Sequence, residues 1–206
     1  MRLPTIIVAL ATSVLAAGCA GQSSGKAKAW YATHGAAEPT HTRVVICHGF
    51  GCYWRTPFQY SDKDLTKIRR MLAGGGRSPK AERAAMAKAV AWAEKRVAPI
   101  VGSANDIGGF DASGAGVRGQ MDCIDEATNT TSLLKLAEKR GWLKHHRVTT
   151  PVARGFFLDG RYPHATAVVV EKTTGTAYAI DSWPRANGHS PDVMALDDWF
   201  ASRSSS

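Results

Sequence analysis

Residues 119–127 read GQMDCIDEA and predict the start of a helix whose first residue is a cysteine. Asp122 has a side chain typical of an N-cap, and an apolar periodicity follows from 123 to 140. Free backbone N–H groups at a helix N-terminus favour a thiolate, whereas the carboxylates of Asp122, Asp125 and Glu126 oppose it. The ionisation of Cys123 therefore depends on which groups the rest of the fold brings to it.

The chain on both sides of this helix predicts a mixed α+β domain. A strand at 43–47 and two capped helices come before a glycine-rich loop that leads to Cys123. After the helix, segments of small and β-branched residues predict strands, and a turn at 173–175 joins the last two. We expect helices at 61–73, 79–97 and 123–140, with Pro99 just past the second; later strands at 152–158, 164–172 and 177–181; and a short helix or strand at 191–200.

Two residues of the predicted hairpin have side chains that can activate a thiol. His164 opens one strand, and Asp181 closes the next. An imidazole beside Cys123 can take its proton, and a carboxylate can orient the imidazole and hold its tautomer. The turn signal lies slightly too far along the chain for His164 to oppose Asp181 directly. We therefore expect a bulge or a diagonal contact between them.

This order of residues resembles the transglutaminase-like (papain-like) thiol fold. Residues 122–127 read D-C-I-D-E-A and resemble the D-C-E-D-Y-A motif of bacterial transglutaminase-like cysteine proteinases. The pairs His164-Ala165 and Ile180-Asp181 are similar to that family's other two motifs. The resemblance covers roughly residues 85–185. The chain departs from the pattern at Ile124, Glu126 and Ser182-Trp183.

The resemblance implies that the helix with the cysteine packs on a small antiparallel sheet that carries the histidine and the aspartate. It also implies acyl transfer, in which Cys123 attacks an amide carbonyl, His164 moves the proton and Asp181 orients His164. The Cys123 N–H and the Gln120 side chain are candidates to stabilise the oxyanion. Such a triad requires no metal and no organic cofactor.

Three alternatives to a peptidase or amidase stay open. An amine in place of water as the acyl acceptor would give a cross-linking enzyme. The departures from the family pattern leave room for a catalytically silent envelope-binding module of the same fold. A disulfide between Cys123 and Cys47 or Cys52 would make Cys123 a structural residue.

The other two cysteines of the domain lie in VVICHGFGCYW, residues 44–54. Cys47 and Cys52 flank a His-Gly-Phe-Gly turn, and three cysteines in an oxidising compartment predict one disulfide, Cys47–Cys52, and one free thiol. The stretch also looks like the oxyanion loop of an α/β-hydrolase, but the chain lacks the G-x-S-x-G nucleophile elbow. Cys47, His48 and Cys52 have no evident fourth ligand, so we expect no metal site there.

The first residues, MRLPTIIVALATSVLAAGCAGQ, resemble a bacterial lipoprotein signal peptide. The apolar stretch over 5–17 is too short to span a bilayer, and LAAGC at 15–19 resembles a lipobox. We expect a signal peptide over 1–18, lipidation of Cys19 with a palmitate-type chain, a flexible tether over 19–40 and one domain over 41–206. Ala20 favours the outer membrane, with the domain facing the periplasm.

The chain has 26 lysines and arginines against 17 aspartates and glutamates, a formal net charge of +9. The basic residues cluster in 63–96, which predicts a solvated helical face or attraction to anionic phospholipid or envelope polymer. We expect no nucleic-acid partner for an exported protein. The expected partners are an envelope protein or peptide substrate and the membrane, through the lipid. The pair His145-His146 follows a basic helix end and is expected to be exposed.

Overall fold

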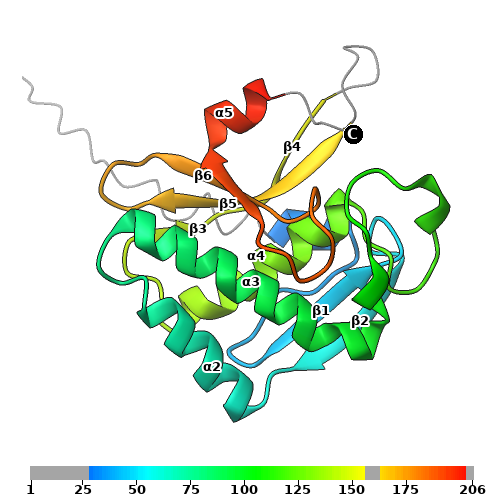
Figure 1. Cartoon of the computed structure of the whole chain (residues 1–206), viewed down its shortest axis with the longest axis horizontal. Coiled ribbons are helices and arrows are strands. Elements are labelled where there is room, and N and C mark those ends of the chain that lie inside the picture. Colours follow the sequence, from blue (N-terminus) through cyan, green and yellow to red (C-terminus); the bar gives the residue numbers. More distant parts are fainter. Residues whose placement is uncertain (1–27, 156–162, 203–206) are drawn as a thin grey trace, which may run out of the picture.

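The computed structural model describes residues 28–155 and 163–202, which form a mixed α+β structure (Figure 1). Its centre is α4 (Cys123–Lys139), which packs between two antiparallel sheets. The smaller sheet contacts α4 through β1 (Arg43–His48), and the larger one through β5 (His164–Glu171). The α+β class expected from the sequence is therefore confirmed.

The smaller sheet is a hairpin that ends in the disulfide loop. β1 pairs with β2 (Trp54–Gln59), and the register runs from Arg43 opposite Gln59 to His48 opposite Trp54. The predicted disulfide between Cys47 and Cys52 is present and closes the turn between the strands. The sequence pattern does not predict β2 because Pro57 lies inside it, and a proline is tolerated only where a strand has a free edge.

The larger sheet has the strand order β3-β5-β6-β7, and β4 pairs with the N-terminal half of β5. Every position of β5 is buried, which explains its run of small and β-branched residues. The expected strands at 164–172 and 177–181 are confirmed; the one at 152–158 forms over 152–154, and 156–158 lie outside the described residues. The remaining bounds are β3 (His146–Val148), β4 (Val152–Arg154), β6 (Ala177–Asp181) and β7 (Asp192–Ala195).

Two further helices, α2 (Asp62–Ala73) and α3 (Pro79–Val101), begin at the predicted serine caps. α3 continues past its expected end at 97, and Pro99 lies inside its last turn. A proline disfavours a helix because it lacks an N–H. Here the helix continues because Val97, Ala98 and Val101 are buried, and Gly102 ends it with a left-handed backbone at φ 89°.

The C-terminal segment contains both of the structures that its pattern allows. β7 is followed at once by α5 (Leu196–Ala201), which places Trp199 in the interior, 1% exposed. No helix in the described ranges is long and apolar enough to cross a membrane.

The expected tether over 19–40 differs from the structure where the two overlap. Residues 28–33 form a helix, and Tyr31 is only 2% exposed, with its hydroxyl 3.0 Å from Ser132 Oγ on α4. Trp30 donates its indole N–H to Thr128 Oγ1 at 3.0 Å. The folded part of the chain therefore begins before residue 41, because two aromatic side chains find partners on α4. The expected signal peptide and Cys19 lie outside the described residues.

The prediction that His145 and His146 are solvent-exposed is wrong for His146, which is fully buried in β3, and His145 is partly buried. The cause is the buried carboxylate of Glu82 on α3. It accepts the His146 N–H at 2.9 Å and lies 2.8 Å from His146 Nδ1. A basic helix end predicts solvent exposure for the residues that follow it, but the hydrogen bonds to Glu82 hold the start of β3 in the interior.

Candidate active site

His164 and Asp181 form a buried hydrogen-bonded pair on the larger sheet. The register of β5 and β6 sets Ala167 opposite Ile180, so the next position sets Thr166 opposite Asp181. His164 lies two residues beyond Thr166 on the same face, and its contact with Asp181 is therefore diagonal. His164 Nε2 is 2.6 Å from Asp181 Oδ2, and the residues are 2% and 4% exposed. Of the two expected geometries, the diagonal contact is the one found.

Cys123 is the first residue of α4 and is 7% exposed. Its thiol donates to the Pro163 carbonyl at 3.8 Å, and the Ala165 backbone N–H also bonds to it. The sulphur thus contacts the backbone on both sides of His164. His164 Nδ1 is buried without a hydrogen-bond partner in the described part of the chain. This nitrogen remains available to the thiol, since Nε2 is occupied by Asp181.

The surroundings of Cys123 favour the thiol over the thiolate. Burial raises the pKa of Cys123 to about 12, and the negative charges of Asp122 and Asp181 act in the same direction. The Ala165 N–H and the Cys123 backbone N–H oppose this shift but do not cancel it. A proton acceptor is therefore needed before the sulphur can act as a nucleophile at neutral pH.

The acids around Cys123 have a structural role. Asp122 and Asp125 form a capping box at the start of α4, in which Asp122 Oδ1 accepts the N–H groups of Ile124 and Asp125. Each acid also reaches the disulfide loop. Asp125 accepts the N–H of Phe50 at 2.7 Å and of Cys52 at 2.6 Å, while Asp122 accepts the N–H of Gly51 at 3.0 Å.

The disulfide loop presents these N–H groups because its backbone is left-handed. Residues 49–52 all have positive φ values, between 60° and 82°, and two of them, Phe50 and Cys52, are not glycines. Such backbone is costly for a residue with a side chain, so it needs compensation. The Cys47–Cys52 bond and the two carboxylates supply it. Since both cysteines are bonded to each other, Cys123 is the free thiol, and a Cys123 disulfide with either is excluded in this structure.

We expect the Asp122→Asn variant to lower the pKa of Cys123, because it removes the largest charge that raises that pKa. Asparagine is as good an N-cap as aspartate, so α4 keeps its start. The iodoacetamide alkylation rate of Cys123, followed against pH by mass spectrometry, should rise at a lower pH than in the wild type. Asp111→Asn, which changes another N-cap aspartate, is the control and should leave the profile unchanged. An unshifted profile in Asp122→Asn contradicts the electrostatic explanation.

Two tryptophans pack on the imidazole of His164. The ring centroid of Trp183 is 4.5 Å from that of His164, and the centroid of Trp199 is 5.3 Å from it. Trp199 also donates its indole N–H to Asp181 Oδ2 at 2.7 Å. Trp183 is itself 5% exposed and forms part of the wall around the imidazole. Sequence reasoning missed Trp199, because a tryptophan in an apolar segment predicts only burial. It does not predict a hydrogen bond to a particular carboxylate.

Gln120 lies in the loop before α4. Its backbone carbonyl accepts the Gly49 N–H at 2.6 Å, and its own N–H bonds to Val117 at 3.3 Å. Its side chain is half-buried, and its Cβ lies near Gly114. The structure shows no hydrogen bond of the Gln120 side-chain amide in the described residues, so its role at an oxyanion stays a prediction.

Glu126, one of the departures from the family motif, lies behind the pair of His164 and Asp181. Ser182 donates to Glu126 Oε2 at 2.8 Å, and Ser182 Oγ is 3.0 Å from Thr130 Oγ1. Burial raises the pKa of Glu126 well above its usual value, and the nearby Glu94 adds to the shift. The buried surroundings of Glu126 therefore favour its protonated form over the carboxylate.

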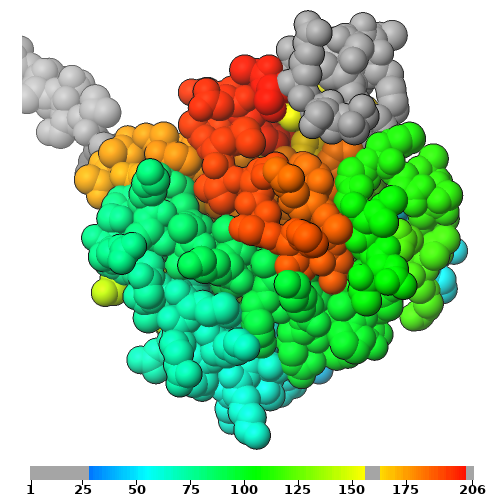
Figure 2. Space-filling view, in the orientation of Figure 1, coloured from blue at the N-terminus to red at the C-terminus, as the bar shows by residue number. Residues whose placement is uncertain are grey.

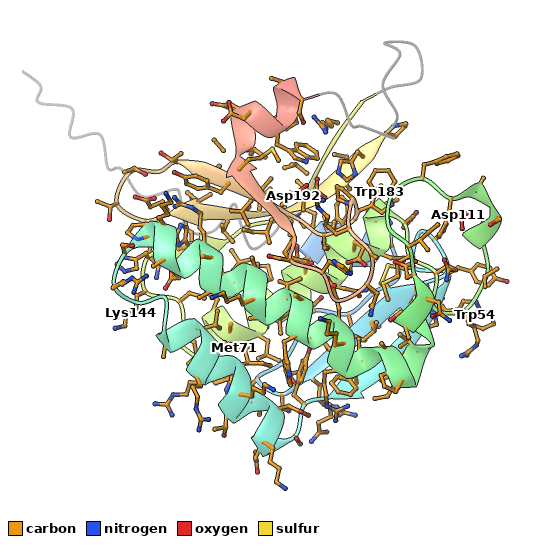
Figure 3. All side chains as sticks on the ribbon, viewed as in Figure 1. Trp54, Met71, Asp111, Lys144, Trp183 and Asp192 are labelled. Carbon is orange, nitrogen blue, oxygen red and sulfur yellow. A yellow bond between two sulfur atoms is a disulfide. The ribbon has the colours of Figure 1, made fainter. Side chains whose placement is uncertain are left out.

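Two loops lie beside the site. The loop between α3 and α4 contacts the segment between β6 and β7, where Gly109 donates to the Trp183 carbonyl at 2.7 Å and Asn187 donates to the Asp106 carbonyl at 3.0 Å. In Figure 2 these two segments, green and orange, adjoin on the same face of the molecule. Figure 3 shows Trp183 between Asp192 and Asp111 in that region.

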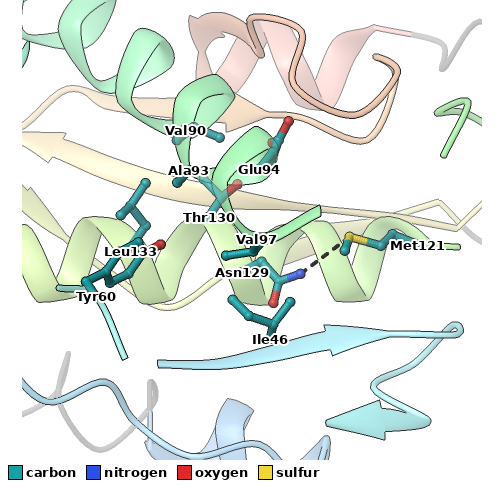
Figure 4. Close-up of a pocket in the computed structure, with 10 residues that line it drawn as sticks. All are labelled: Ile46, Tyr60, Val90, Ala93, Glu94, Val97, Met121, Asn129, Thr130 and Leu133. Carbon is teal, nitrogen blue, oxygen red and sulfur yellow. Dashed lines mark hydrogen bonds between the residues drawn. The ribbon is translucent and has the colours of Figure 1, made fainter. Parts of the chain in front are cut away.

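A small apolar cavity lies elsewhere, between α3, α4 and β1 (Figure 4). Its volume is about 30 Å³, which fits about one water molecule and no substrate. Glu94 is its acidic residue; burial raises the Glu94 pKa to about 8, and its Oε1 has no partner within the described ranges. The cavity is lined by Ile46, Tyr60, Val90, Ala93, Glu94, Val97, Met121, Asn129, Thr130 and Leu133.

Comparison with known proteins gives no match: no family model, no curated protein and no solved structure is similar to this chain. The geometry around Cys123, His164 and Asp181 is therefore the basis for a functional proposal.

Proposed function

We propose that the protein is a cysteine hydrolase that cleaves a peptide or amide bond by acyl transfer. The observation that carries the proposal is the buried group in which Cys123 contacts the backbone on both sides of His164, while Asp181 holds His164 Nε2 at 2.6 Å. A thiol, an imidazole with one free nitrogen and an orienting carboxylate are the parts that nucleophilic catalysis needs.

The mechanism follows from the free nitrogen. As Cys123 Sγ attacks the substrate carbonyl carbon, His164 Nδ1 takes the thiol proton, and the carbonyl oxygen becomes an oxyanion. The C–N bond then breaks, and the amine leaves with the proton from Nδ1, which forms a thioester on Cys123. Water attacks the thioester with His164 as the base, and the acid product leaves. Asp181 keeps the other proton on Nε2 throughout, so Nδ1 is always the nitrogen that exchanges protons.

Within the same proposal, the fold is of the transglutaminase-like type. The support is the arrangement of α4 against an antiparallel sheet whose neighbouring strands carry His164 and Asp181. The family's use of both water and amines leaves cross-linking as a second outcome of the same acyl-enzyme. The substrate we propose is an envelope protein or peptide.

The proposed location is the cell envelope, through a lipid on Cys19 and facing the periplasm. The support is the lipobox-like sequence at 15–19 and the disulfide Cys47–Cys52, which persists in an oxidising compartment. Membrane fractionation of the Cys19→Ala variant tests it. Release of the variant into the soluble fraction is expected, and an unchanged membrane fraction would refute the anchor.

A catalytically silent binding module is the second candidate, because one observation favours it: the resting thiol is buried and its pKa is raised to about 12. In that case Cys123 would fill space at the start of α4 and would not react.

Covalent trapping separates the two candidates. The protein, kept without reductant so that Cys47–Cys52 stays intact, is treated with peptide amides that carry a thiol-directed electrophile at the scissile position. We expect labelling of Cys123 by mass spectrometry, lost in Cys123→Ser and kept in His189→Ala, which changes an exposed histidine. If the labelling of Cys123 does not exceed that of an unfolded control peptide with the same cysteine, the proposed hydrolase is refuted and the binding module remains.

A further inference from the structure

The C-terminal helix α5 contributes directly to the group around His164. Trp199 is 1% exposed, and its indole N–H donates to Asp181 Oδ2 at 2.7 Å. The same oxygen is 2.6 Å from His164 Nε2. Asp181 Oδ1 is buried and has no partner in the described part of the chain. One carboxylate oxygen therefore takes both donors, and the other takes none.

We propose that Trp199 is a positioning residue for the Cys–His–Asp group, an inference that rests on the proposed function. Its N–H fixes the rotation of the Asp181 carboxylate so that Oδ2 faces His164 Nε2. This holds the His164 proton on Nε2 and leaves Nδ1 free for the thiol. Without the indole donor, the carboxylate has two equivalent oxygens and a free torsion, and the imidazole loses its fixed partner.

The indole also closes this hydrogen bond off from water. The Trp199 ring centroid is 5.3 Å from the His164 ring centroid. The Trp183 ring centroid, at 4.5 Å from His164, makes a second aromatic contact with the imidazole. A hydrogen bond to a charged group is stronger where the surroundings are dry. Trp199 thus acts through both its N–H and its ring.

Trp199 is itself held from β4. Arg154 stacks on the Trp199 ring, with its guanidinium carbon 4.2 Å from the ring centroid, and donates to the carbonyls of Trp199 and Ser202. Arg154 lies opposite His164 in the register of β4 and β5. β4, the strand paired with β5 at His164, therefore anchors α5, and α5 becomes part of the site.

The first test is the tautomer of His164, which does not depend on any substrate. In the wild type we expect the ¹⁵N resonances of His164 to show the proton on Nε2 and a bare Nδ1. In Trp199→Phe, which keeps an aromatic ring but loses the donor, we expect a mixture of tautomers. Trp142→Phe is the matched control, because Trp142 is a partly buried indole packed on the main core and not on His164.

The second readout is the reactivity of Cys123. Loss of a hydrogen bond to a charged group corresponds to roughly a tenfold or larger fall in rate, so Trp199→Phe should react with iodoacetamide about tenfold more slowly while Trp142→Phe does not. If Trp199→Phe fails to fold, the Asp181→Asn variant provides the test. In that variant the indole N–H resonance of Trp199 should move upfield, whereas the indole N–H resonance of Trp142 should not move.

The outcomes separate the two proposals. If Trp199→Phe loses the Nε2 tautomer and the wild-type thiol is inert, the positioning role is supported and the proposed enzymatic function is refuted. A tautomer and an alkylation rate equal to the wild type in a folded Trp199→Phe overturn the positioning role and leave the triad standing. An unmoved Trp199 resonance in Asp181→Asn also overturns it.

Discussion

Iodoacetamide should alkylate Cys123 at least about 10²-fold more slowly in the His164→Ala variant than in the wild type at neutral pH. The reason is the environment of the sulphur, where burial raises the thiol pKa to about 12 and almost no thiolate is present without a base. His164 Nδ1 is buried without a hydrogen-bond partner in the described residues, and the thiol contacts the backbone on both sides of His164. Removing the imidazole removes the proton acceptor that the proposed mechanism assigns to the thiol.

The measurement is the second-order rate of iodoacetamide modification of the Cys123 peptide against pH. His189→Ala is the control, since it removes an exposed imidazole and should keep the wild-type profile. In His164→Ala the rate should rise only in strongly alkaline solution, as a buried thiol with a raised pKa requires. Equal rates in wild type and His164→Ala mean that the thiol is not activated, and the silent binding module becomes the better interpretation.

The Glu82→Ala variant should lose about 4 kcal/mol of unfolding free energy at neutral pH, because breaking a buried ionic group leaves unpaired donors in the interior. Glu82 is fully buried. Its carboxylate accepts the backbone N–H of Lys144 at 2.6 Å and of His145 at 2.9 Å, besides two contacts with His146. All of these donors lose their partner together in the variant, and β3 loses its attachment to α3.

This loss should depend on pH with a definite sign. Burial by itself raises the pKa of Glu82, but the hydrogen bonds from His146, Lys144 and His145 outweigh burial and lower the pKa below its ordinary value of 4.5. The stabilisation is therefore complete above about pH 4.5 and is lost as the pH falls through the lowered value. Urea unfolding at neutral and at acid pH should show a large difference between wild type and Glu82→Ala that shrinks in acid.

Glu38→Ala is the matched control for this experiment. Glu38 is 3.9 Å from Lys139, but both side chains are more than a third exposed, and surface pairs of this kind contribute little. Its unfolding free energy should stay close to that of the wild type. A Glu82→Ala variant that is as stable as Glu38→Ala would show that the buried carboxylate is not what holds β3.

The sequence alone determines the elements whose signals are local. A serine or aspartate cap sits beside the groups it bonds, and so Ser61, Ser78 and Asp122 mark the helix starts without any tertiary information. The same holds for the turn at 173–175 and for the disulfide across the short turn from Cys47 to Cys52. The order of Cys123, His164 and Asp181 on a helix start and two neighbouring strands is also readable from these local patterns.

Tertiary structure alone decided the features whose partners are distant in the chain. His146, in β3, has the sequence context of a surface residue, but the carboxylate of Glu82 on α3 buries it. Trp30 and Tyr31 look like part of a tether until Thr128 and Ser132 offer them hydrogen bonds. No periodicity or spacing near these residues contains that information, because the free energy comes from the pairing and not from either residue.

The same division runs through the site. The sequence places acids beside Cys123, and it cannot tell whether they serve chemistry or structure. The fold shows that Asp122 and Asp125 accept N–H groups of the left-handed loop at 49–52. It also shows that Trp199 donates a second hydrogen bond to Asp181. The protonation of Cys123 was beyond sequence reasoning for the same reason: a pKa depends on burial and on charges within a few ångströms, and only the folded chain sets both.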